Sequence, residues 1–157
     1  MQSVANHTYQ CASIVRENDH DRYLTVLHAR AEDQAALFAL YAFNVEIART
    51  REVVTEPALG EIRLQWWREV IEGTRRRHEV ATPLSDAIAQ GLLIPADLLA
   101  IVDARETEAD DAVATLADWR AYFYASAGGV AAGAGSANAR AASATATKSA
   151  TAAEQTA

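Results

Sequence analysis

The amino-acid sequence predicts an all-α protein, and three observations support this fold class. Apolar residues recur at three- and four-residue spacing along most of the chain, which is the pattern of helices that bury one face. Pro83 and Pro95 stand where such segments begin, and proline fits the first turn of a helix because its missing N–H has no partner there. Half of the 157 residues are hydrophobic, so the chain can bury the core of one domain.

The segment "LFALYAFNVEIARTRE", residues 37–52, is predicted to form one uninterrupted helix. Its expected core face consists of Leu37, Leu40, Tyr41, Asn44, Ile47 and Ala48. The second half of the helix also carries Glu46, Arg49 and Arg51. These charged residues raise the question of what the helix does besides packing.

A second long helix is predicted for "EIRLQWWREVIEG", residues 61–73, after Pro57 has broken the first pattern. Its expected core stripe consists of Ile62, Trp66, Glu69 and Val70. Gly73 is the expected C-cap. Trp66 and Trp67 point about 100° apart on a helix, so we expect Trp66 in the core and Trp67 at a seam.

Three further helices are predicted, for residues 82–93, 94–111 and 115–129. Thr82 is the expected N-cap of the first, and Thr115 that of the third. Across all of the helices, the residues predicted to be largely buried are Leu37, Leu40, Tyr41, Ile47, Leu64, Trp66, Val70 and Leu98.

The composition changes abruptly after Gly129. Residues 130–157 consist almost entirely of Ala, Ser, Thr and Gly, with no large apolar side chain after Val130. Such a segment buries too little to offset the entropy lost on ordering its backbone. We therefore expect a helical domain over residues 1–129 and a disordered tail over residues 130–157 that does not dock on it.

The charge balance argues against one broad class of function. The chain has 14 basic and 21 acidic residues, net charge −7, whereas general nucleic-acid binders need a basic excess for phosphate contacts. The single cysteine, Cys11, has no partner for an internal disulfide and no zinc-site spacing around it. The sequence shows neither a secretory signal nor a transmembrane run, so we expect a cytoplasmic location, with contact to a membrane surface left open.

Two acidic clusters are weak candidates for metal binding. Asp19 and Asp21 flank His20, but Asp before a helix is an ordinary N-cap, and we favour capping. Asp103 and Glu106 lie one helical turn apart, and such a DxxE pair is able to hold Mg²⁺ through oxygen ligands. A solvated helix end is the simpler interpretation, because charge runs usually face water.

Four segments carry a family resemblance: "DHDRYL", "ALFALYAFNVEIARTREVVTEP", "GEIRLQWWREVIEG" and "IVDARETEADD". They closely resemble the N-terminal half of the squalene/phytoene synthase family, especially the branch that includes the mitochondrial complex I assembly factors. The resemblance extends from about Tyr9 to Gly128. It implies a partial isoprenoid-synthase-type helical bundle, in a family whose active members join two prenyl diphosphates head to head.

The resemblance indicates which family motif corresponds to the charged half of the first long helix. In active members an aspartate-rich DDxxD motif follows the "LYAF" segment and holds Mg²⁺ against the substrate diphosphate. Counting from "LYAF" places that motif on Ala48, Arg49, Thr50, Arg51 and Glu52. The first four cannot bind Mg²⁺, and the two arginines would repel the cation while attracting phosphate. The motif is therefore degenerate, and we assign no catalytic residue.

The resemblance also implies which side chains face a ligand. Those expected to line the cavity or contact a diphosphate are Tyr41, Asn44, Arg49 and Arg51. The remaining weak candidates for metal ligands are Glu52, Asp103 and Glu106, which would have to converge. No cofactor is expected unless they do, and the cofactor would then be Mg²⁺.

A second departure from the family concerns its C-terminal half. Active members carry another aspartate-rich motif there, facing the first, whereas this chain has the Ala/Ser/Thr-rich segment. The sequence is therefore interpreted as truncated. Half of a bundle would expose apolar surface, which favours self-association.

Two hypotheses of function follow from these departures. The first is a non-catalytic scaffold or assembly-type protein that binds a protein partner, or a prenyl or lipid ligand. The alternative is a Mg²⁺-dependent prenyl transferase of isoprenoid biosynthesis, and a fragment without function is a third possibility. The degenerate motif favours the first hypothesis.

Overall fold

The computed structural model describes residues 2–53, 57–109, 130–131 and 134–135, with side chains described for 6–50, 58–106 and the four residues after 129. Within these ranges all regular structure is helical, which confirms the all-α prediction. The helices are α1 (Gln2–Asn18), α2 (His20–Leu27), α3 (Ala31–Val53), α4 (Pro57–Ile71), α5 (Ala81–Ala89) and α6 (Pro95–Ala109). No helix among the described residues is long and apolar enough to cross a membrane.

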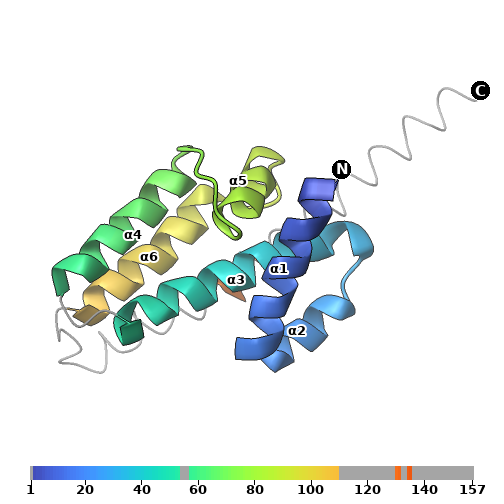
Figure 1. Cartoon of the computed structure of the whole chain (residues 1–157), viewed down its shortest axis with the longest axis horizontal. Coiled ribbons are helices and arrows are strands. Elements are labelled where there is room, and N and C mark those ends of the chain that lie inside the picture. Colours follow the sequence, from blue (N-terminus) through green and yellow to red (C-terminus); the bar gives the residue numbers. More distant parts are fainter. Residues whose placement is uncertain (1, 54–56, 110–129, 132–133, 136–157) are drawn as a thin grey trace, which may run out of the picture.

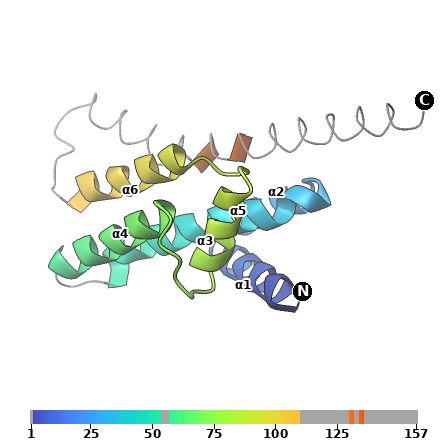
Figure 2. The ribbon, with the colours of Figure 1, turned by 90° about the horizontal axis from the view of Figure 1, so that it is seen from above.

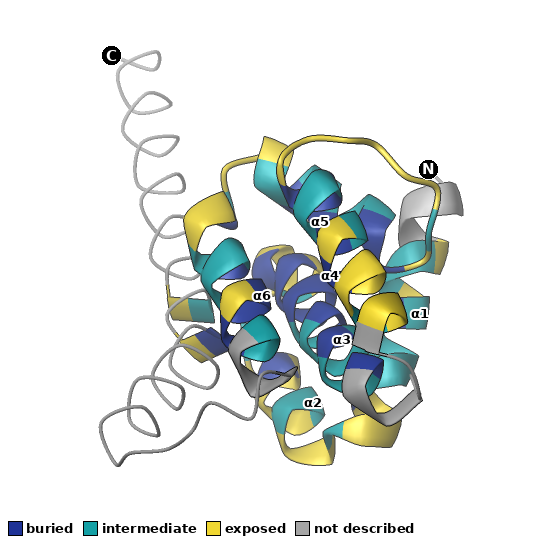
Figure 3. Ribbon diagram, turned by 90° about the vertical axis from the view of Figure 1, so that its left-hand side faces the viewer, coloured by how far each residue is buried: buried dark blue, intermediate teal, exposed yellow. Residues whose placement is uncertain are grey.

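The longest helix, α3, lies at the centre of the arrangement and contacts each of the other five (Figure 1). The helices α4 and α6 lie side by side along one half of α3, whereas α1 and α2 pack around its other half (Figure 2). The short helix α5 contacts α1, α3 and α4. Buried residues line the inward faces of all these helices (Figure 3).

The first half of α3 is enclosed on almost every side. Its buried residues include Ala36, Leu37, Phe38, Ala39, Leu40, Ala42 and Phe43. The predicted burial of Leu37, Leu40 and Ile47 is confirmed, whereas Tyr41 is only half-buried. A helix that contacts five neighbours needs apolar residues around its whole circumference, and the "ALFALYAF" segment supplies them.

The core face of α4 differs from the predicted stripe. Trp67 is buried, with 3 % of its surface exposed, and its ring meets that of Phe43 of α3 edge-on at 5.2 Å. Trp66 is half-buried, and Ile62 is 64 % exposed. The prediction that Trp66 rather than Trp67 lies in the core is therefore wrong. The helix is rotated so that Trp67, and not Trp66, faces α3. Leu64, Val70 and Leu98 are buried as predicted.

The ends of α2, α4 and α5 show how local sequence sets the helix boundaries. Asp19 caps α2, since its Oδ1 accepts the backbone N–H of Arg22 at 3.1 Å, which confirms the predicted cap. Gly73 follows the end of α4 with φ +115°, as expected of a C-cap glycine. The predicted cap Thr82 lies inside α5, which begins at Ala81.

Two of the four described residues after Gly129 pack against the helical core. Val130 is buried, with 1 % of its surface exposed, and Ala134 is half-buried against the same core. The expectation that the segment does not dock is therefore wrong at its first residues. The predicted helix at 115–129 and the rest of the tail, from residue 136, lie outside the described residues.

Gly60 marks the place where α4 approaches α3. A Cβ added at Gly60 would lie 4.0 Å from Cγ2 of Thr50, which is ordinary van der Waals contact. We expect Gly60→Ala to raise the free energy of unfolding by about 0.5–1 kcal/mol, because alanine loses less backbone entropy in a helix. Urea denaturation followed by circular dichroism measures this change.

Gly91 provides the matched control with the opposite expected sign. Its φ of +70° completes the Schellman motif at the end of α5, in which Leu92 N donates to Ala87 O at 3.0 Å. Gly91→Ala should therefore lower the free energy of unfolding by about 1 kcal/mol. A destabilised Gly60→Ala variant would show that α3 and α4 lie closer together than described here.

Candidate functional site

The residues at the degenerate motif position lie on the last turns of α3. Thr50 is buried, with 5 % of its surface exposed, and its Oγ1 donates a hydrogen bond to the backbone carbonyl of Glu46 at 3.2 Å. Ala48 is half-buried and has no ligand atom in its side chain. Arg51 and Glu52 belong to α3, but their side chains lie outside the described residues. The expected roles of these two side chains therefore remain predictions.

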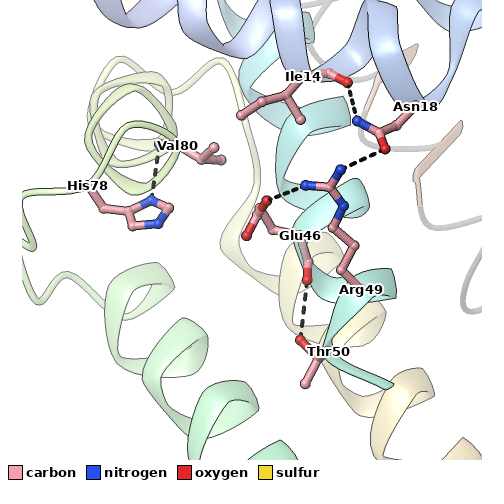
Figure 4. Close-up of polar contacts among 7 residues, drawn as sticks. All are labelled: Ile14, Asn18, Glu46, Arg49, Thr50, His78 and Val80. Atoms are coloured by element: carbon pink, nitrogen blue, oxygen red, sulfur yellow. Dashed lines mark hydrogen bonds and ion pairs between the residues drawn. The ribbon is translucent and has the colours of Figure 1, made fainter. Parts of the chain in front are cut away.

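Arg49 links the end of α3 to the end of α1 (Figure 4). Its Nη2 donates to Oδ1 of Asn18 at 2.8 Å, and its Nη1 lies 3.5 Å from Oε1 of Glu46. The Asn18 side chain is held in turn, because its Nδ2 donates to the carbonyl of Ile14 at 2.7 Å. The guanidinium therefore has two protein partners, and it lies at the position where the resemblance predicts a metal-binding carboxylate in active members.

Tyr41 and Asn44 lie on the same face of α3 as Ala48, as predicted, and all three are half-buried. The Tyr41 ring lies under the guanidinium of Arg22, whose Cζ is 5.3 Å from the ring centroid. Arg22 is fixed by an ion pair with Asp19 at 3.1 Å. Burial raises the pKa of the Tyr41 hydroxyl above its ordinary value, and the charge of Arg22 partly opposes this effect.

The two weak metal candidates of α6 converge on an arginine of α4. Nη1 of Arg68 lies 2.6 Å from Oδ1 of Asp103, and its Nη2 lies 2.6 Å from Oε2 of Glu106. Arg68 Nε also donates to Oε1 of Glu106 at 3.2 Å, so this contact is bidentate. The hydrogen bond to Glu106 is the main cause of a raised pKa of the Arg68 guanidinium. We call these three residues the Arg68 clasp.

The three residues at the motif position whose side chains are described, Ala48, Arg49 and Thr50, do not fit Mg²⁺. Ala48 offers no oxygen, Arg49 carries a positive charge, and Thr50 directs its hydroxyl to the helix backbone. In the described part of the chain, no three His, Cys, Asp or Glu residues come close enough together to hold a metal ion. Asp103 and Glu106 serve instead as anionic partners of Arg68.

Arg68 and Asn18 are functional partners that the sequence pattern did not single out. Arg68 lies 38 positions from Glu106, and Asn18 lies 31 positions from Arg49. The signal for the clasp in the sequence was the one-turn spacing of Asp103 and Glu106, which made them a weak candidate pair for Mg²⁺, although a solvated helix end was favoured.

Comparisons with known proteins place this arrangement in a family. The family model described as squalene/phytoene synthase matches residues 15–154. The chain belongs to the squalene/phytoene synthase family. The family match includes the motif position on α3 and the Arg68 clasp, and it continues through most of the segment from residue 130 onward. No solved structure matches the chain.

Within this family, the curated relatives that match include complex I assembly proteins. The human protein named NADH dehydrogenase (ubiquinone) complex I, assembly factor 6, is 35 % identical over 107 residues, which are 66 % of this chain and 32 % of the relative. The rat protein of the same name is 36 % identical over 110 residues, 68 % of this chain and 33 % of the relative. A Drosophila melanogaster homolog is 38 % identical over 63 residues, 40 % of this chain and 19 % of the relative. The chain thus spans about a third of the length of the mammalian relatives.

The contact between Arg49 and Asn18 gives a stability prediction. We expect Arg49→Ala to lower the free energy of unfolding by about 1 kcal/mol, because a charge-assisted hydrogen bond between α3 and α1 is lost. A double-mutant cycle with Asn18→Ala, measured by urea denaturation, should give a coupling energy of about 0.5–1 kcal/mol.

Arg63→Ala is the matched control, because Arg63 is an exposed arginine on α4 and its replacement should change stability by less than about 0.5 kcal/mol. A coupling energy of zero between Arg49 and Asn18 would contradict a structural role for the Arg49 guanidinium.

Proposed function

We propose that this chain is a non-catalytic member of its family that acts by binding, as a scaffold or assembly-type protein. The observation that carries the proposal is the arginine at the motif position. Arg49 stands where a metal-binding carboxylate is expected, and it is engaged by Asn18 and Glu46. A side chain with two intramolecular partners supports the packing of α1 on α3 rather than metal chemistry.

The chemistry of the family reaction supports the same proposal. Ionising an allylic diphosphate requires several positive charges on the leaving group, which the family's mechanism supplies as Mg²⁺ held by carboxylates. An arginine supplies positive charge but repels the metal ions that would bridge protein and substrate. Asp103 and Glu106 of α6, the other candidate metal ligands, are paired with Arg68 in the clasp.

The names of the relatives indicate the kind of binding. Several matching relatives are named as assembly factors of NADH dehydrogenase complex I, and they are similar to this chain over about a third of their length. We therefore propose a protein partner connected with the assembly of this type of complex. A prenyl or lipid ligand and self-association remain part of the proposal, as does a cytoplasmic location with contact to a membrane surface.

An enzymatic assay separates the proposal from the prenyl transferase alternative. Incubated with Mg²⁺ and farnesyl or geranylgeranyl diphosphate, the chain should form no head-to-head product and release no diphosphate above background. The readouts are product chromatography and a coupled assay for diphosphate. Mg²⁺-dependent release that is lost in Glu52→Ala or Asp103→Ala would overturn the proposal and make the chain an enzyme with rearranged ligands.

A genetic assay tests the assembly role directly. Deletion of the gene should lower the amount of assembled NADH dehydrogenase complex on native gels, and the wild-type chain should restore it. The Glu52→Gln variant should restore it equally well, because the proposed role uses no carboxylate at the motif position. Normal assembly of the complex in the deletion strain would exclude this role while leaving the enzymatic result unaffected.

A further inference from the structure

The loop between α4 and α5 brings a histidine ring to the first turn of α5. Nδ1 of His78 accepts a hydrogen bond from the backbone N–H of Val80 at 3.1 Å (Figure 4). It also accepts one from the backbone N–H of Ala81 at 3.4 Å. Val80, the residue at the N-cap position, has no polar side chain of its own. The imidazole ring therefore takes the place of the usual Ser, Thr, Asp or Asn cap.

The same ring packs against both tryptophans of α4. The centroid of the His78 ring lies 5.4 Å from that of Trp66 and 5.7 Å from that of Trp67, both in edge-on geometry. The His78 backbone is also tied to α5, because its N–H donates to Oγ1 of Thr82 at 3.3 Å and its carbonyl accepts Thr82 N–H at 3.0 Å. One side chain thus joins the beginning of α5 to the aromatic face of α4.

The hydrogen-bond geometry fixes where the ring carries its proton. A nitrogen that accepts from two N–H groups must present its lone pair, so Nδ1 is unprotonated and the proton of the neutral ring is on Nε2. A second proton on Nδ1 would remove both acceptor contacts. It would also place a positive charge at the helix N-terminus, where the helix dipole disfavours it.

We infer that His78 is a proton-sensitive cap, and that protonation of Nδ1 releases the first turn of α5 and loosens its contact with Trp66 and Trp67. The folded chain holds the ring in its neutral form through Val80 and Ala81, whereas the unfolded chain has no such contacts. The cap is therefore present while Nδ1 carries no proton and is lost when Nδ1 is protonated.

The described elements packed against the ring and its loop present aromatic side chains, backbone groups and one thiol. The α4 helix presents Trp66 and Trp67, and α5 presents backbone N–H groups. The α1 helix reaches the loop through Cys11, whose Sγ donates to the carbonyl of Glu79 at 3.6 Å. Burial raises the pKa of the Cys11 thiol to about 12, so it stays neutral.

The charged residues of the loop and of its neighbours are held in pairs or lie in solvent. Arg75 is paired with Asp86 of α5 at 3.2 Å, and Arg76 is paired with Glu69 of α4 at 2.8 Å. The remaining charged residues of the loop are all exposed: Glu72, Arg77 and Glu79. Solvent screens exposed charges, so these residues interact only weakly with a protonated His78 ring and cannot replace the lost cap.

His28 provides a matched control of opposite chemistry. Its Nδ1 lies 2.8 Å from the carbonyl oxygen of Leu24, so this nitrogen must donate and therefore carries a proton. His28 also follows the last turn of α2, where positive charge is favourable. Protonation of His28 keeps its contact, whereas protonation of His78 destroys one.

A titration of the wild-type chain tests the inference without any substitution. Long-range ¹H–¹⁵N spectra should show His78 Nδ1 as an unprotonated nitrogen at about pH 8, and its protonation on acidification towards about pH 5 should coincide with shifts of the Val80 and Ala81 amides and of the Trp66 indole. A proton on Nδ1 at pH 8, or ring protonation that leaves those amides unchanged, would overturn it.

Thermal unfolding of two variants gives an independent result. Between about pH 8 and pH 5, the midpoint of wild-type unfolding should fall by about 3 °C more than that of His78→Asn, which keeps a cap acceptor but cannot titrate. His28→Asn should show the full wild-type fall. An equal fall in His78→Asn and wild type would contradict the inference, and if His78→Asn does not fold, the wild-type spectra decide.

Discussion

Replacing Trp67 with alanine is expected to lower the free energy of unfolding by about 3–5 kcal/mol, the largest effect of any substitution considered for this protein. Trp67 has 3 % of its surface exposed and packs edge-on against Phe43 at 5.2 Å. Its removal leaves a large cavity between α3 and α4 that neighbouring side chains cannot fill, because both helices are held by other contacts.

Trp66→Ala is the matched control for this prediction. Trp66 is half-buried, so its replacement should cost only about 1–2 kcal/mol. Urea denaturation monitored by far-ultraviolet circular dichroism measures both variants and avoids the loss of tryptophan signal. A Trp66→Ala variant that is the less stable of the two would reverse the assignment of core and seam on α4.

Disrupting the Arg68 clasp should also destabilise the chain. We expect Arg68→Ala to lower the free energy of unfolding by about 1–2 kcal/mol, because α4 loses its contacts with Asp103 and Glu106 of α6 and leaves these carboxylates to repel each other. Arg68→Lys should recover little of this loss, since an ammonium group cannot make the bidentate contact with Glu106.

Salt dependence and a second arginine distinguish the clasp from an ordinary surface ion pair. The loss in Arg68→Ala should shrink at high salt, where the attraction and the repulsion are both screened. Arg76→Ala, which removes a more exposed pair with Glu69, should cost less than about 0.5 kcal/mol. Equal losses in the Arg68 and Arg76 variants would show that the clasp contributes no more than any surface pair.

The sequence predicted α3, α4, α5 and α6 because their apolar spacing and their helix-breaking residues are local patterns, whereas α1 was not predicted. The stripe of Leu37, Leu40 and Ile47 has helical spacing, and all three are buried. Counting from "LYAF" assigned the motif position to residues 48–52, and this assignment stays a prediction. Asp19 was recognised as a cap because N-capping is likewise a local pattern.

Predictions that depend on how helices pack were less successful. Trp66 and Trp67 are both apolar neighbours on one helix, and only the direction of α3 decides which is buried. The partners of Arg49 and Arg68 lie more than 30 positions away, so periodicity carries no information about them. The cap of α5 was missed because an imidazole nitrogen of His78 took the role expected of the Thr82 hydroxyl.

Because α3 packs against all of the other described helices, a residue cannot be inserted within it without disturbing that packing. One inserted residue rotates every later side chain by about 100° about the helix axis. An insertion after Phe43 would therefore move Ile47 and Thr50 out of the core and turn charged residues such as Glu46 towards it. A surface helix can absorb such a shift by turning, but α3 contacts each of the other five described helices, so turning it would disturb all of these contacts. Changes in length between relatives should accordingly fall in the loops, and the spacing from "LYAF" to the motif position should stay constant.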